Sequence, residues 1–339
     1  MARLTQAIKN LTRLTSLSTR VLADIGVGTA LVQRPPTFTV PAFVNLSIAG
    51  YFGGGENTTV NLSGIDKITF AADTKTTLSA TLTTGRSQLA GMANSGVAGY
   101  FGGGTDGANI SGIDKITFPA DSKTTLSATL TTARVFLAGM ANSGVAGYFG
   151  GGNDGARTNG IDKITFAADT KTTLSATLTD ALWRAGAMAN SGVAGYFGGG
   201  ESATVNLSQI DKITFPADTK TTLSPTLTTG RAKLAGMANS GVAGYFGGGD
   251  DGANISGIDK ITFPADTKST LSATLTTART FLAGMANKGV AGYFGGGFDS
   301  ARTDEIDKIT FSADTKTTLT AKLTDARWRL AAMADSGVL

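Results

Sequence analysis

Beyond about residue 40, short apolar segments alternate with polar turns in a pattern that predicts β-strands. One unit of this pattern contains four expected strands, over residues 65–70, 77–83, 89–94 and 97–102. The Ser-Gly pair at 95–96 is typical of a tight hairpin between the last two strands. This part of the chain is therefore expected to be all-β.

The expected strands differ in the side chains that they carry. In 77–83, the apolar residues Leu78, Ala80 and Leu82 alternate with hydroxyl residues, which predicts a half-buried outer strand. The 89–94 strand contains small residues and one methionine. Small side chains are expected where inner strands converge on an axis, because little space remains between them.

One sequence unit recurs six times and sets the architecture. Each copy contains Tyr-Phe-Gly-Gly-Gly, and successive tyrosines are 48 or 49 residues apart. A fixed period of this size is typical of a propeller or repeat array. Six units of four strands predict a six-bladed β-propeller over residues 46–339. The repeated tyrosines are Tyr51, Tyr100, Tyr148, Tyr196, Tyr245 and Tyr293.

The order of features within each unit resembles the kelch type of β-propeller. A glycine run such as Gly53-Gly54-Gly55 is followed about ten residues later by a strand, and an arginine precedes the next small-residue strand. In the third unit Leu182 replaces this arginine, and Leu78 and its equivalents stand where kelch repeats carry tryptophan. The arginines are Arg86, Arg134, Arg231, Arg279 and Arg327.

A longer period lies above the short one. The segment 56–64 matches 201–209, Asp106 to Ile110 match Asp251 to Ile255, and each match is shifted by 145 residues. Units one to three therefore recur as units four to six. The ring is expected to consist of two three-blade halves related by a pseudo-twofold axis.

The C-terminal segment predicts how the ring closes. Residues 333–338 repeat the small-residue strand and its turn, but no strand like 97–102 follows them. The missing partner is at 48–53, so the C-terminal strand is expected to occupy the innermost position of the first blade. The segment 43–45 is the competing candidate for that position.

The N-terminal segment is expected to be a separate element. Residues 1–28 form a predicted amphipathic helix for anchoring or oligomerisation, and 29–45 form a linker that contains two adjacent prolines. Docking on a partner or on copies of the chain is favoured over an interfacial membrane helix or a cleaved transit peptide. No segment is expected to cross a membrane. The apolar face includes Leu4, Ile8, Leu11, Leu14, Val21 and Ile25.

Composition removes several functional classes. The chain contains no histidine and no cysteine, so no Ser-His-Asp triad, thiolate site or imidazole metal site is expected. Residues 1–45 carry five basic side chains and one acidic one, whereas the repeats are neutral overall. This distribution argues against nucleic-acid binding. We predict a protein that is not an enzyme and that requires neither cofactor nor metal.

The differences between units should gather on one face of the ring. Alternating strand direction places the loops after the glycine runs and the crossovers between units on the same face. Tryptophans with adjacent arginines are typical of interaction hot spots and sugar platforms, but packing between blades is an equally weighted interpretation. The candidate binding residues are Trp183, Arg184, Trp328, Arg329, Phe136, Phe281, Arg157 and Arg302.

These observations predict a non-enzymatic structural or binding propeller anchored in a larger assembly. The Thr, Ala and Gly richness and the Tyr-Phe-Gly-Gly-Gly repeats are similar to repeat proteins of bacteriophage particles, especially tails. The resemblance implies location in the virion, with the helix bound to other virion proteins and the varied face contacting a host glycan or protein. A cytoplasmic location, or one peripheral to another complex, is the alternative.

Two further functions stay open at this stage. A lectin-like propeller would use Trp183 and Trp328 to bind glycans. A hydrolase or lyase would use carboxylates on the varied face, although aspartates that recur in every unit are better explained as turn and cross-strand partners. The Asp-containing loops at 153–155 and 250–252 are likewise interpreted as turns in preference to weak calcium sites.

Overall fold

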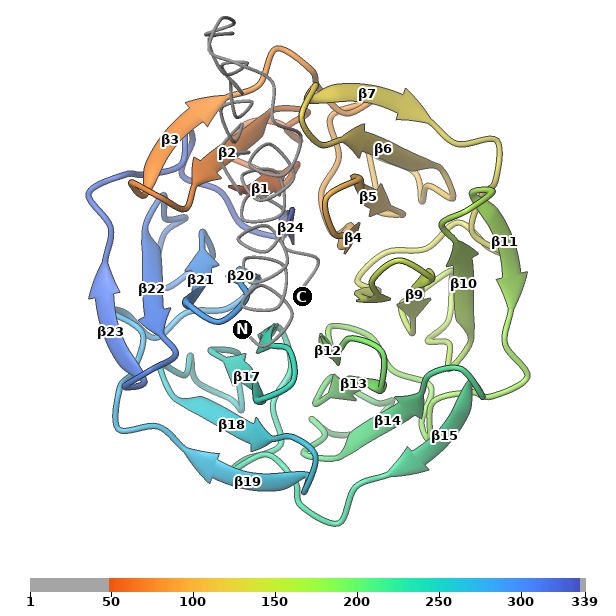
Figure 1. Cartoon of the computed structure of the whole chain (residues 1–339), viewed down its shortest axis with the longest axis vertical. Helices are drawn as coiled ribbons and strands as arrows, with labels where there is room; N and C mark the ends of the chain where they lie inside the picture. Colours follow the sequence, from red (N-terminus) through yellow and green to blue (C-terminus); the bar gives the residue numbers. More distant parts are fainter. Residues whose placement is uncertain (1–48, 336–339) are drawn as a thin grey trace, which may run out of the picture. The chain divides into compact units, whose positions relative to one another are not determined.

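The computed structural model describes residues 49–335, which form a six-bladed β-propeller of four-stranded blades (Figure 1). Each blade is an antiparallel sheet whose strands succeed one another from the axis outwards. The predicted all-β class is confirmed for this part of the chain. The predicted helix at 1–28, the linker at 29–45 and the segment 43–45 lie outside the described residues.

The strands have short, closely matched bounds. The innermost strands are β24 (Ala331–Ala334), β4 (Ala90–Asn94), β8 (Ala138–Asn142), β12 (Gly186–Asn190), β16 (Ala235–Asn239) and β20 (Ala283–Asn287). The second strands are β1 (Ala49–Gly53), β5 (Ala98–Gly102), β9 (Ala146–Gly150), β13 (Ala194–Gly198), β17 (Ala243–Gly247) and β21 (Ala291–Gly295).

The outer half of each blade repeats in the same way. The third strands are β2 (Ile65–Thr69), β6 (Ile113–Thr117), β10 (Ile161–Thr165), β14 (Ile210–Thr214), β18 (Ile258–Thr262) and β22 (Ile306–Thr310). The outermost strands are β3 (Thr74–Thr77), β7 (Ser122–Thr125), β11 (Thr170–Thr173), β15 (Thr219–Thr222), β19 (Thr267–Thr270) and β23 (Thr315–Thr318). Within residues 49–335 no helix is long and apolar enough to cross a membrane.

The C-terminal strand closes the ring, as expected. β24 pairs antiparallel with β1, with Met333 opposite Tyr51, and so becomes the innermost strand of the first blade. Beside this pair, the backbone N–H of Asp335 donates to the carbonyl of Ala49 at 2.8 Å. The first blade therefore combines residues from both ends of the described chain.

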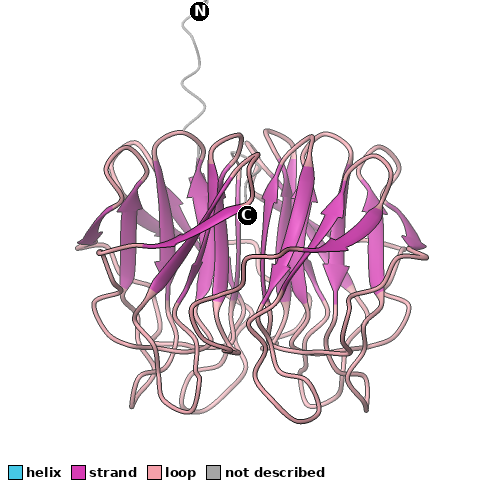
Figure 2. Ribbon diagram, turned by 90° about the horizontal axis from the view of Figure 1, so that it is seen from below, coloured by secondary structure: helices cyan, strands magenta, loops and turns pink. Residues whose placement is uncertain are grey.

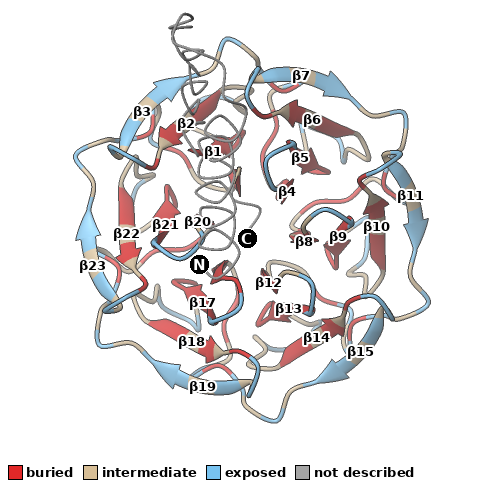
Figure 3. Ribbon diagram, in the orientation of Figure 1, coloured by how far each residue is buried: buried red, intermediate tan, exposed pale blue. Residues whose placement is uncertain are grey.

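The outermost strand differs from the prediction over residues 77–83. β3 begins earlier, at Thr74, and ends at Thr77. Leu78 and Leu82 follow as a loop, and each makes a single backbone hydrogen bond, to the carbonyls of Ile65 and Ser63. The alternation of apolar residues therefore belongs to a loop and not to a strand. In this loop Leu82 packs inwards and is buried. The outer strands themselves are exposed (Figure 3).

Small residues allow the inner strands to approach one another closely. A Cβ atom added to Gly91 would collide with the carbonyl oxygen of Ala332 in the neighbouring blade, and one added to Gly139 would collide with that of Gly91. Side chains also fill glycine positions between blades, because the ring of Phe101 packs against Gly53. The small-residue pattern is therefore a steric requirement of the axis.

Repeated side chains join each blade to the next. The phenol O–H of Tyr51 donates a hydrogen bond to Asp121 of the second blade at 2.8 Å, and the ammonium group of Lys67 donates to the same carboxylate at 2.7 Å. The Tyr51 ring also stacks on Phe118, with 5.2 Å between ring centres. The same contacts recur at all six interfaces, including the closing one, where Tyr293 and Lys308 bind Asp73.

A buried ion pair provides a second link at five of the interfaces. Arg86 is 3.0 Å from Asp114 of the next blade and also donates to the carbonyl of Phe101. The equivalent pairs join Arg134 to Asp162, Arg231 to Asp259, Arg279 to Asp307 and Arg327 to Asp66. The repeated aspartates are therefore structural, as the sequence predicted.

The loops separate into two faces (Figure 2). Short turns such as Ser95-Gly96 lie on one side, which we call the repeated face because its sequence hardly changes between units. Longer loops, which follow the glycine runs or cross between blades, lie on the other side, which we call the varied face. The predicted division into two faces is confirmed.

Candidate functional site

The centre of the varied face is a closed ring of backbone hydrogen bonds. One residue of each crossover, two positions before the innermost strand, donates its N–H to the equivalent carbonyl of the preceding blade, over 2.7 to 2.9 Å. All of these residues have φ between 54° and 62°, in the left-handed region. We call this set the axial ring: Gln88, Phe136, Arg184, Lys233, Phe281 and Arg329.

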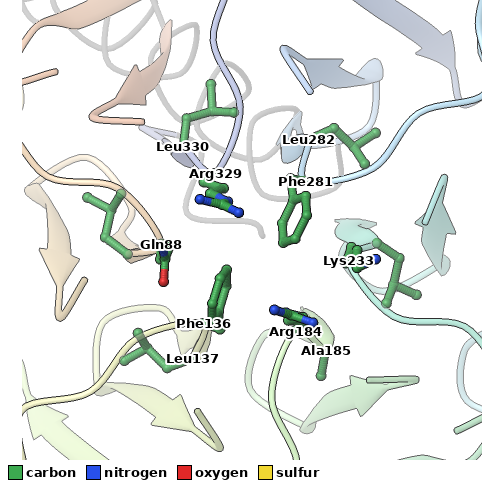
Figure 4. A pocket seen from close by; sticks show the side chains of 12 residues that line it. Gln88, Phe136, Leu137, Arg184, Ala185, Lys233, Phe281, Leu282, Arg329 and Leu330 are labelled. Atoms are coloured by element: carbon green, nitrogen blue, oxygen red, sulfur yellow. The ribbon is translucent and has the colours of Figure 1, made fainter. Parts of the chain in front are cut away.

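The side chains of the axial ring converge on a depression over the propeller axis (Figure 4). Its volume is about 100 Å³, and leucines such as Leu137 and Leu282 line its base. Below it the inner strands contribute glycine and alanine. Because left-handed backbone is strained for residues other than glycine, the hydrogen-bond ring must hold these side chains in place.

A second layer of backbone pairing surrounds the axial ring. The residue before each ring residue forms an isolated β-bridge with the first residue after the glycine run of the next blade. Trp183 pairs in this way with Glu201, and Trp328 pairs with Glu56. The crossover of one blade and the loop of the next are therefore held together at the site.

Each tryptophan belongs to a cluster with two arginines and one glutamate. The guanidinium of Arg184 lies 3.9 Å from the centre of the Trp183 ring system, and that of Arg157 lies 4.8 Å away. Both arginines bind Glu201, each at 2.8 Å. A positive charge over an indole face is attracted to its π-electrons, so the cluster is stabilised by both contacts.

The second half of the propeller repeats this cluster. Arg329 lies 3.9 Å from the centre of the Trp328 ring system and 3.1 Å from Glu56, while Arg302 is 3.0 Å from the same carboxylate. The indoles are consequently covered in part by guanidinium groups. This contact agrees with the packing interpretation, and a role of the indoles in recognition stays a prediction.

Aromatic contacts connect the two clusters across the axis. The ring of Phe136 meets that of Trp183 edge-on at 5.3 Å, and Phe281 meets Trp328 at 5.2 Å. The two phenyl rings are 5.7 Å apart. All eight predicted binding residues thus lie in one continuous assembly, which the separate sequence positions could only suggest. Their role in binding stays a prediction.

The charged groups in this assembly are partly buried, and burial and neighbouring charges shift the pKa of two of them. Burial opposes ionisation of Glu201, but hydrogen bonds from Arg157 and the charge of Arg184 outweigh it and lower the pKa of this carboxyl. Burial lowers the pKa of Arg329, and the nearby positive charges of Arg184 and Arg302 act in the same direction, against the attraction of Glu56. Both glutamates are therefore neutralising partners for arginine.

The two halves of the site differ at a few positions. Lys233 replaces Gln88 in the axial ring and approaches Asp250, with 3.5 Å between Nζ and the carboxylate. Phe298 occupies the position of Asn153 and packs on Trp328, with 4.8 Å between ring centres. A groove of about 330 Å³ runs beside these side chains, from Arg184 to Asn254.

Several residues of the site were not among the predicted ones, including Gln88, Lys233, Glu56 and Glu201. The two glutamates follow the glycine run only in the units that receive a Trp-Arg crossover, which is a coupling that the sequence contains. Gln88 and Lys233 stand at the same crossover position as Arg184, so alignment of the units could have identified them.

Amide and carboxylate side chains in the loops of the varied face shape turns. The side chain of Asn153 accepts from the N–H of Gly155 at 3.0 Å, and that of Asp250 accepts from Gly252 at 3.3 Å. These contacts agree with the expected turn-forming role. Among residues 49–335, no group of carboxylates is placed to hold a metal ion.

Comparison of the sequence with protein family models and with curated proteins finds no match. The six-bladed fold is the part of the kelch resemblance that the structure bears out.

Proposed function

We propose that this propeller is a non-enzymatic binding module that presents its varied face to a target from within a larger assembly. One observation carries the proposal: unit-specific side chains converge on the axial ring, whereas repeated side chains are used at the blade interfaces. A rigid scaffold with a single variable centre is the usual arrangement for recognition on a repeat protein.

The state of the carboxylates supports a binding role over the alternative of a hydrolase or lyase. A general acid needs a raised pKa, which requires an apolar environment or a neighbouring negative charge. Glu201 instead has a lowered pKa and binds two arginines. The buried aspartate Asp66 likewise has a lowered pKa despite its burial, because Arg327 and threonine donors stabilise the carboxylate.

The segment before the propeller is the proposed anchor to a partner. Ala49, where the described residues begin, lies beside Asp335 at the repeated face. We assign this partner to a bacteriophage particle, on the sequence resemblance to virion repeat proteins.

Deletion of residues 1–42 tests the anchoring. The variant should be absent from purified particles, as measured by mass spectrometry, while the released protein keeps the β-type circular dichroism of the full chain. Particles that still incorporate the shortened protein at the normal level would refute anchoring by this segment.

Substitution of the varied face tests recognition. Particles that carry Arg184→Ala and Arg329→Ala should attach less to their target surface than particles with Val97→Ser and Val242→Ser. These valines are exposed on the repeated face and provide a matched control. Equal attachment by both sets would contradict the proposal.

A glycan target is the second candidate, because aromatic and guanidinium groups meet in one depression. A Trp183→Ala/Trp328→Ala variant should then lose binding on a glycan array. Unchanged binding would exclude these indoles from glycan recognition.

A further inference from the structure

The axial ring contains three cationic side chains and no anionic one. Arg184, Lys233 and Arg329 line the depression together with two phenyl rings and one amide (Figure 4). The side chain of Gln88 makes no hydrogen bond within residues 49–335, although its backbone N–H joins the ring. Polar donors thus surround a small space that contains no carboxylate.

Neighbouring carboxylates only partly balance this charge. Around the axis, five cationic side chains share three carboxylates: two arginines bind Glu201, two bind Glu56, and Lys233 approaches Asp250. All three carboxylates lie outside the axial ring. The positive groups therefore line the depression itself, and the carboxylates that partner them lie around it.

The two arginines of the ring come close to the same pair of phenyl groups. The guanidinium of Arg184 lies 4.6 Å from the ring centre of Phe136 and 5.7 Å from that of Phe281. For Arg329 these distances are 5.7 and 5.2 Å. Two like charges held near one apolar contact repel each other, and an anion between them would relieve this repulsion.

The backbone contributes no free hydrogen-bonding edge at the axis. Each N–H and each C=O of the axial ring is already used by the ring. An extended peptide is usually recognised through main-chain hydrogen bonds to a strand edge, which this surface does not offer. Guanidinium, amide and ammonium groups are the available donors, and they suit a carboxylate or sulfate group and sugar hydroxyls.

We infer that the axial ring binds the carboxylate or sulfate group of an acidic saccharide, with Arg184 and Arg329 as its paired anion ligands. This inference rests on the proposed binding role of the varied face and specifies the chemistry of its target. A space of about 100 Å³ admits the anionic group, while the adjoining groove of about 330 Å³ receives the neighbouring sugar beside Phe298 and Trp328.

The difference between the halves gives the ligand a direction. Lys233 and Phe298 lie in one half, and their counterparts Gln88 and Asn153 lie in the other. The groove opens on the side of Lys233. The saccharide therefore enters over the second half of the propeller and places its anionic end on the pseudo-twofold axis.

Calorimetric titration of the full-length protein tests the inference. The probes are a glucuronate-terminated trisaccharide, a sulfated trisaccharide, the neutral glucose-terminated analogue, and a pentaglutamate peptide. At least one acidic saccharide should bind about tenfold or more tightly than the neutral analogue, with affinity that falls as salt increases. The two acidic probes distinguish carboxylate from sulfate as the source of the anion.

Single substitutions assign the effect to residues. Arg184→Gln and Arg329→Gln should each weaken acidic-saccharide binding about tenfold, since each removes a charged hydrogen-bond donor. Gln88→Lys should strengthen it by adding a fourth cation to the ring. Lys123→Gln, on the outer strand β7, is the control and should leave the affinity unchanged. Near-ultraviolet circular dichroism confirms that each variant is folded.

Three outcomes would overturn the inference: equal affinity for acidic and neutral saccharides, arginine variants that bind like the parent protein, or tighter binding of the acidic peptide than of either acidic saccharide. If target attachment still depends on the varied face in any of these cases, the proposed function stands and only the saccharide assignment falls. Loss of dependence on that face would refute the proposed function itself.

Discussion

The buried aspartates between blades show how much one residue contributes to each interface. Asp114 is almost fully buried. Its carboxylate accepts hydrogen bonds from the hydroxyl and the N–H of Thr83 and from the guanidinium of Arg86. In the one interface without arginine, Asp211 keeps the equivalent threonine donors beside Leu182. Threonine donors are thus sufficient for this interface in the structure, and the arginine is an additional charged donor at the other five.

Replacing one of these arginines tests how much it contributes to the stability of its interface. Arg86→Leu should lower the free energy of unfolding by about 2 kcal/mol, because one charged hydrogen-bonded pair is lost while the threonine donors remain. Urea denaturation gives the value. The additional change Asp114→Asn should recover part of the loss, as the carboxylate no longer needs a positive partner. A loss of less than about 0.5 kcal/mol would show that the arginine is dispensable.

All six tyrosines of the chain occupy equivalent interface positions, which makes them sensitive to alkaline pH. Burial raises the pKa of each phenol, and the hydrogen-bonded aspartate raises it further. The folded state therefore favours neutral tyrosine. Stability is fully present below the unfolded value of about 10 and is lost as pH rises above it.

We expect phenolate absorbance to appear only together with unfolding. Ultraviolet absorbance and circular dichroism should change at the same pH, which should lie above about 10. Tyrosine ionisation at about pH 10 in a protein that retains its circular dichroism would contradict the buried hydrogen bonds.

At acid pH the aspartates act in the opposite sense. Burial opposes their ionisation, but arginine and threonine contacts outweigh it and lower the pKa of Asp66, Asp114 and Asp259. Their contribution is present above the unfolded value of about 3.9 and is lost as pH falls through the lower folded values.

The elements were largely predictable because each unit repeats a strong local pattern. The innermost three strands of each blade follow from glycine runs, hairpin signals and apolar residues. The outermost strand was predicted at 77–83 and lies at Thr74–Thr77. Its partner β2 begins at Ile65, which faces Leu78, so an outer strand that continued beyond Leu78 would have no neighbour in β2. That limit depends on the neighbouring strand and was not visible in local alternation.

Close contact between inner strands should make their glycines intolerant of even one methyl group. Gly91→Ala should lower the free energy of unfolding by about 2 kcal/mol, because its Cβ would collide with the Ala332 backbone. Gly64→Ala is the matched control, since its Cβ meets no atom within 4 Å. Thermal or urea unfolding compares the two variants. Equal stability would mean that the inner strands can move apart.

At the scale of the whole molecule, the shift of 145 residues predicted a pseudo-twofold ring, but it did not reveal the site at its centre. The axial ring forms only when six crossovers meet, and its residues are separated by whole blades. The glutamates that bind Arg184 and Arg329 likewise come from loops of the following blades. These residues come close together only because the propeller ring closes, so no single sequence unit could predict their proximity.

The twofold relation predicts that half of the chain can form a complete ring with its own copy. In residues 49–190, β12 has the role that β24 has in the full chain, and Asp73 can accept contacts from Tyr148 as it does from Tyr293. This fragment should be a dimer by analytical ultracentrifugation, with β-type circular dichroism. A fragment ending before β12 is the control and should not form a stable ring. A folded monomer of residues 49–190 would contradict the prediction.

Because β24 pairs with β1, the blades could keep the same order around the ring wherever the chain begins. Asp335 and Ala49 are joined by a hydrogen bond, so a short covalent connection there would turn the described chain into a continuous loop. The loop could then be opened at another repeated-face turn, such as Ser143-Gly144, without removing any blade. By circular permutation, the ends could therefore be moved to any of the blades while the axial ring keeps its six contributors.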